Sequence, residues 1–419
     1  MDAETVSHPS IPRYYAWTGG LGIILALFNS CLIFCLIPQH NILVHPSFWY
    51  EFMTISVFGF IGLFAAGFVL NCSVWMNLDY VKSWKNFIAI YLISGCSWIS
   101  LNSTNYLIWT LILKFRPPMP LNIHICGVFT LFITLGGMWF LFPVNIRKTD
   151  GFFKRYVYFS LSQIFRNGCI WIYFLLARVF LVINPCYQWI LVTVLHLIRE
   201  INGRVLTKLC YKAAGCEKNI ISITCQHEVG CRHAVFLCVA LSLLASTSTS
   251  FLCLGFDFGI NFMLCLKIIW NSKHNNSANN LQTTENVRLQ ELALNEKVVY
   301  IVPLAYSICF LLAYYGPNAK IIGNVKNSLW HFGTVENISR PLYLMGFLLL
   351  IDFVSIMLWA VLLKKFCKID FMDGYLQIQK HAWLIMAVQE AYALNEVMIR
   401  KRLNLLQLNI FVYFKIVSA

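Results

Sequence analysis

The sequence predicts an all-α fold, a polytopic bundle of about ten transmembrane helices. Long apolar blocks recur along almost the whole chain of 419 residues, and short polar connectors between them carry most of the basic residues. The chain is 59% hydrophobic and only 12% charged, whereas soluble domains contain roughly 25% charged residues. So many apolar blocks leave too little polar surface for a water-soluble fold, and the lipid bilayer is the expected surroundings.

The first two blocks are long enough to cross a bilayer. Trp17–Ile37 contains 21 residues and Phe52–Trp75 contains 24, all without charge. Because a helix rises about 1.5 Å per residue, roughly 20 apolar residues cross the hydrocarbon core. Met1–Arg13 is polar and no small-residue cleavage pattern follows, so the first block is expected to be a span and not a signal peptide. The same criterion predicts spans at 87–113, 124–144, 160–183, 185–204, 297–315 and 342–363.

Ala234–Trp270 is too long for one span. Its 37 residues would form a helix of about 55 Å, which exceeds a bilayer even with tilt. A break is expected at Ser246–Ser250 or at Gly255–Gly259. With two spans here and ten in total, the connectors on one side hold most of the 32 Lys and Arg residues and the opposite connectors hold five. Basic connectors favour the cytoplasm, so both termini are predicted to be cytoplasmic.

The bundle is expected to occupy residues 1–363, with two larger cytoplasmic loops. The loop 205–233 contains cysteines and histidines, and the loop 271–296 is rich in Asn, Ser and Thr, which favour turns. Residues 364–419 begin with a basic run and continue with the mixed polar and apolar stretch Leu376–Ile399. That C-terminal segment is predicted to lie in the interface as an amphipathic helix or to form an eleventh span, whereas a single helix over 234–270 would leave nine.

Asp352 is the most informative ionisable residue. It lies near the middle of Leu342–Leu363, where an ionised carboxylate costs several kcal/mol unless it has a partner or is protonated. It could serve as a proton or cation relay, or it could form a hydrogen bond that fixes helix packing. Its possible partners are Arg178, Lys267, Tyr306 and Asn105.

Three more ionisable residues fall within apolar blocks. Asp257 lies between Gly255 and Gly259 and is either at membrane depth or the cap of a helix that starts after a break. Arg178 is predicted to pair with an acidic residue or to extend towards the headgroups. Arg166, nearer the other end of its block, is expected to extend its guanidinium towards the headgroups.

Four potential metal ligands occur together in the predicted loop 205–233. Cys225, His227, Cys231 and His233 could form a tetrahedral zinc site. Their spacing, Cys-x-His-x3-Cys-x-His, matches no common zinc finger. Cysteines beside a membrane are also sites of lipid attachment. A metal site, lipidation and no special role all remain open, and no cofactor is predicted.

Two broad classes are not supported by the sequence pattern, although an intramembrane enzyme acting on lipid remains a third hypothesis without a motif. The basic residues are spread over many connectors and form no concentrated stripe, so a nucleic-acid partner is not expected. The sequence contains no phosphate-binding glycine loop, nucleophile elbow or paired catalytic carboxylates, so an enzyme is not predicted.

The last quarter of the chain carries a family resemblance. Gly316-Pro317-Asn318, Ile322–Trp330, Leu350–Ser355 and Leu363–Ile369 together resemble a block found in uncharacterised multi-spanning membrane proteins of oomycetes such as Phytophthora. An aspartate recurs in those proteins at the position of Asp352. The resemblance implies a multi-pass membrane protein and no particular activity, and Asn395–Ala419 departs from its pattern.

Two functions follow as hypotheses. The first is a channel or carrier for an ion or small solute, with Asp352 as the buried ionisable group. The second is a receptor-like or scaffold protein that binds a ligand or partner through the outer loop Gly316–Arg340. In that loop Gly316, Pro317 and Asn318 favour turns and Trp330 could anchor at the interface. The sequence does not predict an oligomeric state.

Overall fold

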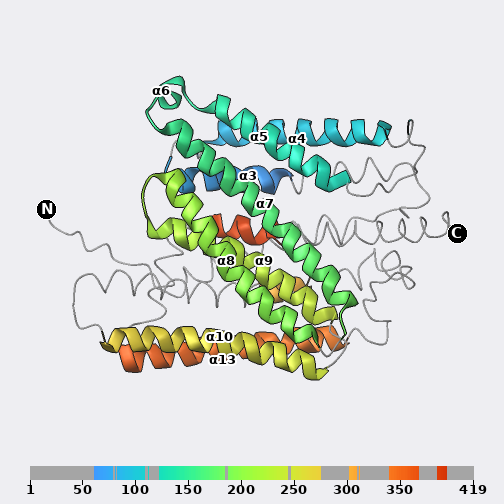
Figure 1. The fold of residues 1–419 in the computed structure, drawn as a ribbon, viewed down its shortest axis with the longest axis vertical. Helices are drawn as coiled ribbons and strands as arrows, with labels where there is room; N and C mark the ends of the chain where they lie inside the picture. The colour runs from blue at the N-terminus through green and yellow to red at the C-terminus, as the bar shows by residue number, and fades with distance from the viewer. Residues whose placement is uncertain are drawn as a thin grey trace.

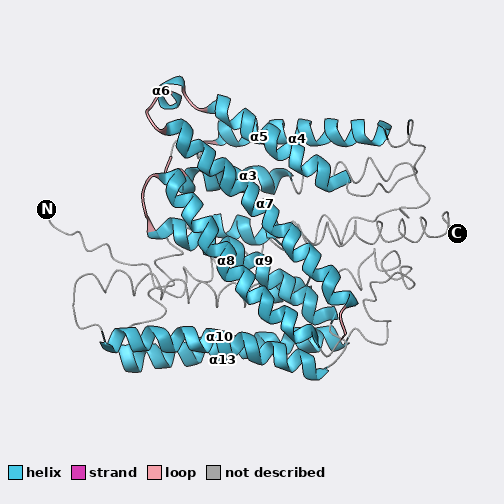
Figure 2. Ribbon diagram, viewed as in Figure 1, coloured by secondary structure: helices cyan, strands magenta, loops and turns pink. Residues whose placement is uncertain are grey.

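The computed structural model describes most residues of 61–108, 122–243, 247–274, 302–308, 339–367 and 385–393, and the regular structure in these ranges is helical (Figure 2). The all-α prediction is therefore confirmed for this part of the chain. The helices with defined bounds are α3 (Gly62–Trp75), α4 (Trp84–Leu107), α5 (Asn122–Leu141), α6 (Val144–Arg147), α7 (Phe152–Val182), α8 (Gln188–Ala214), α9 (Asn219–Leu243), α10 (Thr247–His274) and α13 (Ser339–Cys367). Residues 302–308 and 385–393 are also helical.

The helices pack mainly against their neighbours in sequence. The pairs α4–α5, α7–α8, α8–α9 and α10–α13 make the most extensive contacts. In Figure 1, α4 and α5 lie at one edge, α10 and α13 lie at the opposite edge, and α7, α8 and α9 lie between them. The main apolar core joins α3, α7, α8, α9 and residues 385–393, and a separate cluster joins α10 and α13.

Local sequence explains where several helices begin and end. Ser83 precedes α4 and its hydroxyl accepts a hydrogen bond from the backbone N–H of Asn86 at 3.2 Å, which caps the helix N-terminus. α8 ends at Gly215, whose φ of 72° lies in the left-handed region that glycine adopts without strain. Asn77, with a φ of 54°, follows α3 in the same conformation, which asparagine tolerates better than most residues.

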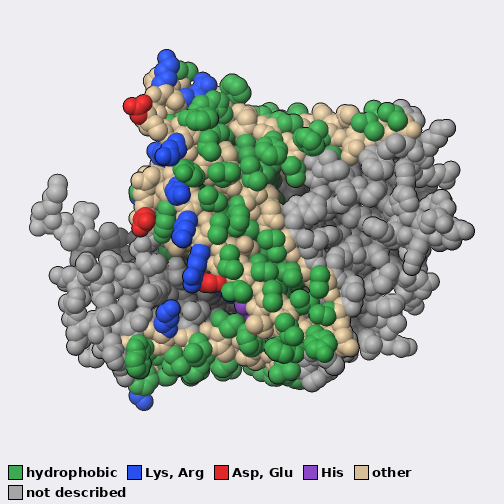
Figure 3. Space-filling view, viewed as in Figure 1, with side chains coloured by type: hydrophobic (Ala, Val, Ile, Leu, Met, Phe, Trp, Pro, Cys, Tyr) green, Lys and Arg blue, Asp and Glu red, His purple; other side chains and the backbone are tan. Residues whose placement is uncertain are grey.

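Three of the links between helices meet at one end of the bundle. The Arg155 guanidinium donates to the carbonyl of Ala213 at 2.8 Å and to the carbonyl of Met76. The Lys218 ammonium donates to Oδ1 of Asn77 at 2.7 Å. The α3–α4, α5–α7 and α8–α9 links therefore lie together, and the α7–α8 link lies at the opposite end (Figure 1). Lys and Arg side chains are concentrated along the shared end (Figure 3).

Removing the Arg155 guanidinium should loosen this end. We expect Arg155→Met to lower the free energy of unfolding by about 2 kcal/mol, because it leaves the last carbonyls of α3 and α8 without a charged donor. Its neighbour Lys154 is exposed, so Lys154→Met should have little effect. Denaturation of the purified protein in mixed detergent micelles, followed by circular dichroism, measures both, and equal stabilities would contradict the prediction.

Apolar side chains cover much of the outer surface of the described helices. Phe140 is 74% exposed and Tyr343 is 81% exposed, and the other large exposed apolar residues are spread over α4, α5, α7, α8, α10 and α13. Two of the described helices are long and apolar enough to cross a membrane, over Trp84–Asn105 and Leu342–Phe366. α7 ends at Val182 and α8 begins at Gln188, so a short turn joins them close to the boundary between the predicted spans 160–183 and 185–204.

One predicted connector is wrong, and at two other places the structure decides between the predicted alternatives. Residues 205–233 are not a loop, because α8 and α9 occupy nearly all of them and leave only a short link after Gly215. α9 ends at Leu243 and α10 begins at Thr247, so the break in 234–270 falls at the Ser246–Ser250 alternative, and α10 continues through Gly255–Gly259. Within 364–419, residues 385–393 are a buried helical segment of the core, which contradicts the interfacial alternative and not the eleventh span. The predicted span 17–37 lies outside the described residues.

The error over residues 205–233 has a physical cause. Residues 205–233 contain many charged and polar side chains, and such a composition is typical of a connector exposed to water. In the folded chain the polar groups of α9 are satisfied by other helices, so a polar sequence can form a central helix.

Candidate functional site: a buried charged cluster

Glu228 lies at the centre of a cluster of buried charges. Its carboxylate oxygen Oε1 is 2.8 Å from Nη2 of Arg232, one turn further along α9, and 3.4 Å from Nε of Arg166 on α7. The side chains of Glu228 and Arg166 are each 3% exposed and that of Arg232 is 6% exposed. Two guanidinium groups therefore share one carboxylate away from solvent.

Further contacts hold the two arginines in place. Nη1 of Arg232 donates to the backbone carbonyl of Arg166, which ties α9 to α7. The ring of Tyr392 lies against both guanidinium groups, with its centroid 5.2 Å from Cζ of Arg166 and 5.9 Å from Cζ of Arg232. Such contacts between a cation and an aromatic face are favourable when water is excluded. The expectation that Arg166 extends towards headgroups is wrong, since its side chain turns inward to Glu228.

His227 joins α9 to residues 385–393. Its Nδ1 is 2.9 Å from Oε1 of Gln389, and its Nε2 is 3.1 Å from Oε1 of Glu390. Nε2 of Gln389 in turn donates to Oδ1 of Asn71 on α3 at 3.3 Å. The side chains of His227 and Glu390 are 0% and 1% exposed, so this is a hydrogen-bonded network within the core.

His227 lies between two oxygen-bearing side chains. Nδ1 faces Oε1 of Gln389 and Nε2 faces Oε1 of Glu390, and which ring nitrogen donates depends on the tautomer. The contact with Glu390 is an ion pair when the imidazole is protonated and a hydrogen bond otherwise.

We call Arg166, His227, Glu228, Arg232 and Glu390 the charged cluster. Within it, Glu228 faces the two arginines and Glu390 faces His227.

The four proposed metal or lipidation residues do not form one cluster. Cys225, His227, Cys231 and His233 lie on one helix, α9, and Sγ of Cys231 is 3.7 Å from the ring nitrogens of His227. His227 contacts Gln389 and Glu390, whereas the ring of His233 lies 4.6 Å from that of His196 on α8. In the described part of the chain, no group of three or more potential ligands is placed to hold a metal. Cys225 and Cys231 are fully buried, so acylation of the folded protein is not feasible.

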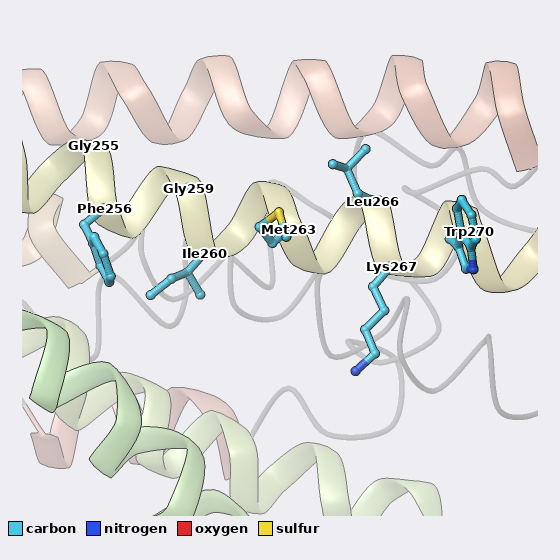
Figure 4. Close-up of a pocket in the computed structure, with 8 residues that line it drawn as sticks. All are labelled: Gly255, Phe256, Gly259, Ile260, Met263, Leu266, Lys267 and Trp270. Carbon is cyan, nitrogen blue, oxygen red and sulfur yellow. The ribbon is translucent and has the colours of Figure 1, made fainter.

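Asp352 is buried on α13, with a relative exposure of 2%. α13 packs against α10 and α9. Two of its possible partners are excluded: Asn105 is on α4 at the far edge of the bundle, beside Cys126 (Figure 1), and Lys267 points away from the helix that packs on α10 (Figure 4). Tyr306 is buried.

An apolar groove of about 790 Å³ runs along α10. Its described lining comes from this helix alone, and Figure 4 shows Phe256, Ile260 and Met263 along it, with Lys267 among them. The groove has one charged side chain and no carboxylate among its described lining residues. It offers apolar contact and little chemistry.

Several predicted site residues lie outside the described part of the chain. These are the side chains of Arg178 and Asp257, although both residues belong to described helices, and the outer-loop residues Gly316, Pro317, Asn318 and Trp330. The sequence analysis missed Glu228, Arg232 and Glu390. The available signal was Glu228 and Arg232 at i and i+4, a spacing that places both charges on one face of a helix.

Comparison of the chain with protein-family models, with curated proteins and with solved structures finds no match.

Proposed function

We propose that this chain is a multi-pass membrane protein of about ten spans that carries an ion or small solute, and that its transport is linked to a proton. The observation that carries the proposal is the His227–Glu390 pair, a fully buried imidazole and carboxylate 3.1 Å apart. Asp352 is the second buried acid of the proposed pathway.

The distribution of side chains supports the membrane part of the proposal. The described helices expose many large apolar residues, and five charged residues are buried among them, a combination that is unusual for a protein in water. The excess of Lys and Arg in certain connectors predicts that the α3–α4, α5–α7 and α8–α9 links are cytoplasmic. These links lie at one end of the bundle, where Lys and Arg gather (Figure 3). An even number of spans places both termini on that same side of the membrane.

The energetic cost of the charged cluster supports the transport part. Placing several ionised groups in a low-dielectric core is unfavourable, and well-packed apolar residues often give equal or better stability. Ionisable groups within membrane bundles commonly mark ion pathways and proton relays. Histidine serves as a proton shuttle in many proteins, and His227 faces a carboxylate 3.1 Å away.

Proton flux through reconstituted protein tests the proposal. Proteoliposomes loaded with a pH-sensitive dye should dissipate an imposed pH gradient faster than protein-free liposomes. Glu390→Gln should reduce this flux at least about 10-fold, because an amide cannot take up the proton. Asp352→Asn should also reduce it for the same reason, and unchanged flux would remove Asp352 from the pathway.

The matched control is Glu200→Gln. Glu200 forms an exposed pair with Arg204 on α8, so its loss should leave flux unchanged. Wild-type flux no faster than that of empty liposomes would overturn the proposal. Equal flux in wild type and Glu390→Gln, with both proteins folded, would remove the His227–Glu390 pair from the pathway.

A further inference from the structure

We infer that the apolar groove along α10 binds an anionic phospholipid, with one acyl chain in the groove and the headgroup phosphate paired with the Lys267 ammonium. The inference rests on the membrane part of the proposed function and adds a lipid ligand to it. The site involves no residue of the charged cluster, so it does not depend on proton transfer.

The dimensions of the groove are the first argument. Its volume is about 790 Å³, and its described lining runs along α10 from Gly255 to Trp270. Between Gly255 and Lys267 the helix rises about 18 Å, and one leaflet of the hydrocarbon core is about 15 Å thick. The groove is therefore long enough for an acyl chain that lies against the helix from the headgroup level to the middle of the bilayer.

Two glycines provide the space in the groove. Gly255 and Gly259 lie one turn apart on α10, and a Cβ added at either would meet no described atom within 4 Å. At this end Phe256 contacts α8, where its ring centroid is 6.4 Å from that of His196. The face of α10 that packs on α13 contains Cys265 and is a different one. The space beside the glycines is therefore open to a chain-like apolar ligand.

Lys267 gives the groove its charge complementarity. Its side chain extends from the side of α10 that faces away from α13, as do those of Phe256 and Ile260 (Figure 4). Lys267 is exposed, and no described carboxylate pairs with its ammonium. Lysine binds phosphate as a point charge. One ammonium at the end of an apolar groove therefore matches a ligand with one acidic headgroup and an apolar chain.

The position of Lys267 along α10 agrees with the headgroup level. From Thr247, where α10 begins, the helix rises about 30 Å to Lys267, which is the thickness of the hydrocarbon core. Trp270 follows within one turn and is 65% exposed, and tryptophan is enriched at the membrane interface. The connector after α10 is predicted to be cytoplasmic, and the cytoplasmic leaflet contains the anionic lipids that attract lysine. These positions favour a phospholipid of that leaflet.

Native mass spectrometry of the full-length chain, released from detergent, tests the inference. The probes are dioleoylphosphatidylglycerol, which is anionic, and dioleoylphosphatidylcholine, which has the same acyl chains and no net charge. The wild-type chain should retain one phosphatidylglycerol and prefer it about 5-fold, the factor expected for one lysine near an anionic surface. Lys267→Gln should abolish the preference and Lys267→Arg should keep it. Lys364→Gln is the matched control, because Lys364 is exposed in the last turn of α13, and it should leave the preference unchanged.

Gly259→Leu tests the acyl-chain part of the site. The leucine side chain would occupy the groove, and α10 should persist because leucine is a better helix former than glycine and its Cβ meets no described atom within 4 Å. Retention of both lipids should fall at least about 5-fold, since the acyl chain loses its packing surface. Gly346→Leu on α13 is the matched control: a Cβ there also meets nothing within 4 Å, but Gly346 does not line the groove, so retention should not change.

Several results would overturn the inference. The wild-type chain could retain no phosphatidylglycerol, Lys267→Gln and Lys364→Gln could have equal effects, or Gly259→Leu could retain lipid as the wild type does. A wild-type dimer that Gly259→Leu dissociates, with lipid retention unchanged, would assign the groove to a second copy of the chain and also overturn it.

The proteoliposome assay separates failure of this inference from failure of the proposed function. Loss of lipid retention with proton flux intact refutes only the α10 site. Absence of proton flux with phosphatidylglycerol retained refutes proton-linked transport and leaves the α10 site standing. A chain that stays soluble and monodisperse without detergent refutes the membrane part of the proposed function and this inference with it.

Discussion

Glu228→Leu is expected to lower the free energy of unfolding by about 3–5 kcal/mol, the largest effect of any substitution considered for this protein. The carboxylate of Glu228 serves two buried arginines, at 2.8 Å from Arg232 and 3.4 Å from Arg166. Leucine has a similar volume, so packing changes little, but both guanidinium groups lose their negative partner. A buried charge left in this way costs far more than the pair itself contributes.

The chain contains a matched control for this prediction. Glu200 and Arg204 on α8 have the same residue types, the same i, i+4 spacing and the same 2.8 Å distance, but their side chains are 58% and 71% exposed. Exposed pairs contribute about 0–1 kcal/mol, so Glu200→Leu should change stability by no more than that. Denaturant titration in detergent micelles measures both variants. Similar losses in the two would show that burial of Glu228 does not govern its contribution.

Trp359→Ala should cost about 3 kcal/mol by opening a cavity between α10 and α13. The indole is fully buried, and its ring centroid lies 5.6 Å from that of Phe262 and 6.0 Å from that of Phe258. Cys265 and Leu363 complete the same cluster. In a bilayer the loss is mainly one of packing contacts, since lipid and protein interior are similarly apolar.

Trp270 on α10 provides the comparison for Trp359. It is the same residue type in the same helix pair, but it is 65% exposed, so Trp270→Ala leaves no internal cavity and should lower stability by less than about 1 kcal/mol. Thermal unfolding of both variants in detergent is the measurement. A Trp359→Ala protein as stable as Trp270→Ala would contradict the packing of α10 on α13.

Most helices with defined bounds in the described part of the chain were predictable from apolar runs. The predicted spans 87–113, 124–144 and 342–363 correspond to α4, α5 and α13 within a few residues. These runs are long and carry few charges, so hydrophobicity alone specifies them. α9 was mispredicted because its charged residues are satisfied by partners far away in sequence. His227, for example, contacts Gln389 and Glu390, which are 162 and 163 residues away along the chain.

The site was predictable only in part. Asp352 was correctly predicted to be a buried ionisable residue. An acidic side chain within a long apolar run is expected to face the interior of the bundle and not lipid. Its possible partners could not be ranked from sequence, and the structure removes Asn105 and Lys267 from them. The cysteine and histidine spacing suggested a metal site, but spacing along the chain does not state which residues face one another on a helix.

The sequence by itself determined that this chain forms helices and which of them are apolar enough for a lipid environment, since both properties depend on short-range composition. Only the tertiary structure decided that Arg166, His227, Glu228, Arg232 and Glu390 meet. The physical reason is that a charge inside an apolar bundle must find its partner in space, and the packing of α7, α9 and residues 385–393 determines which partner is within reach.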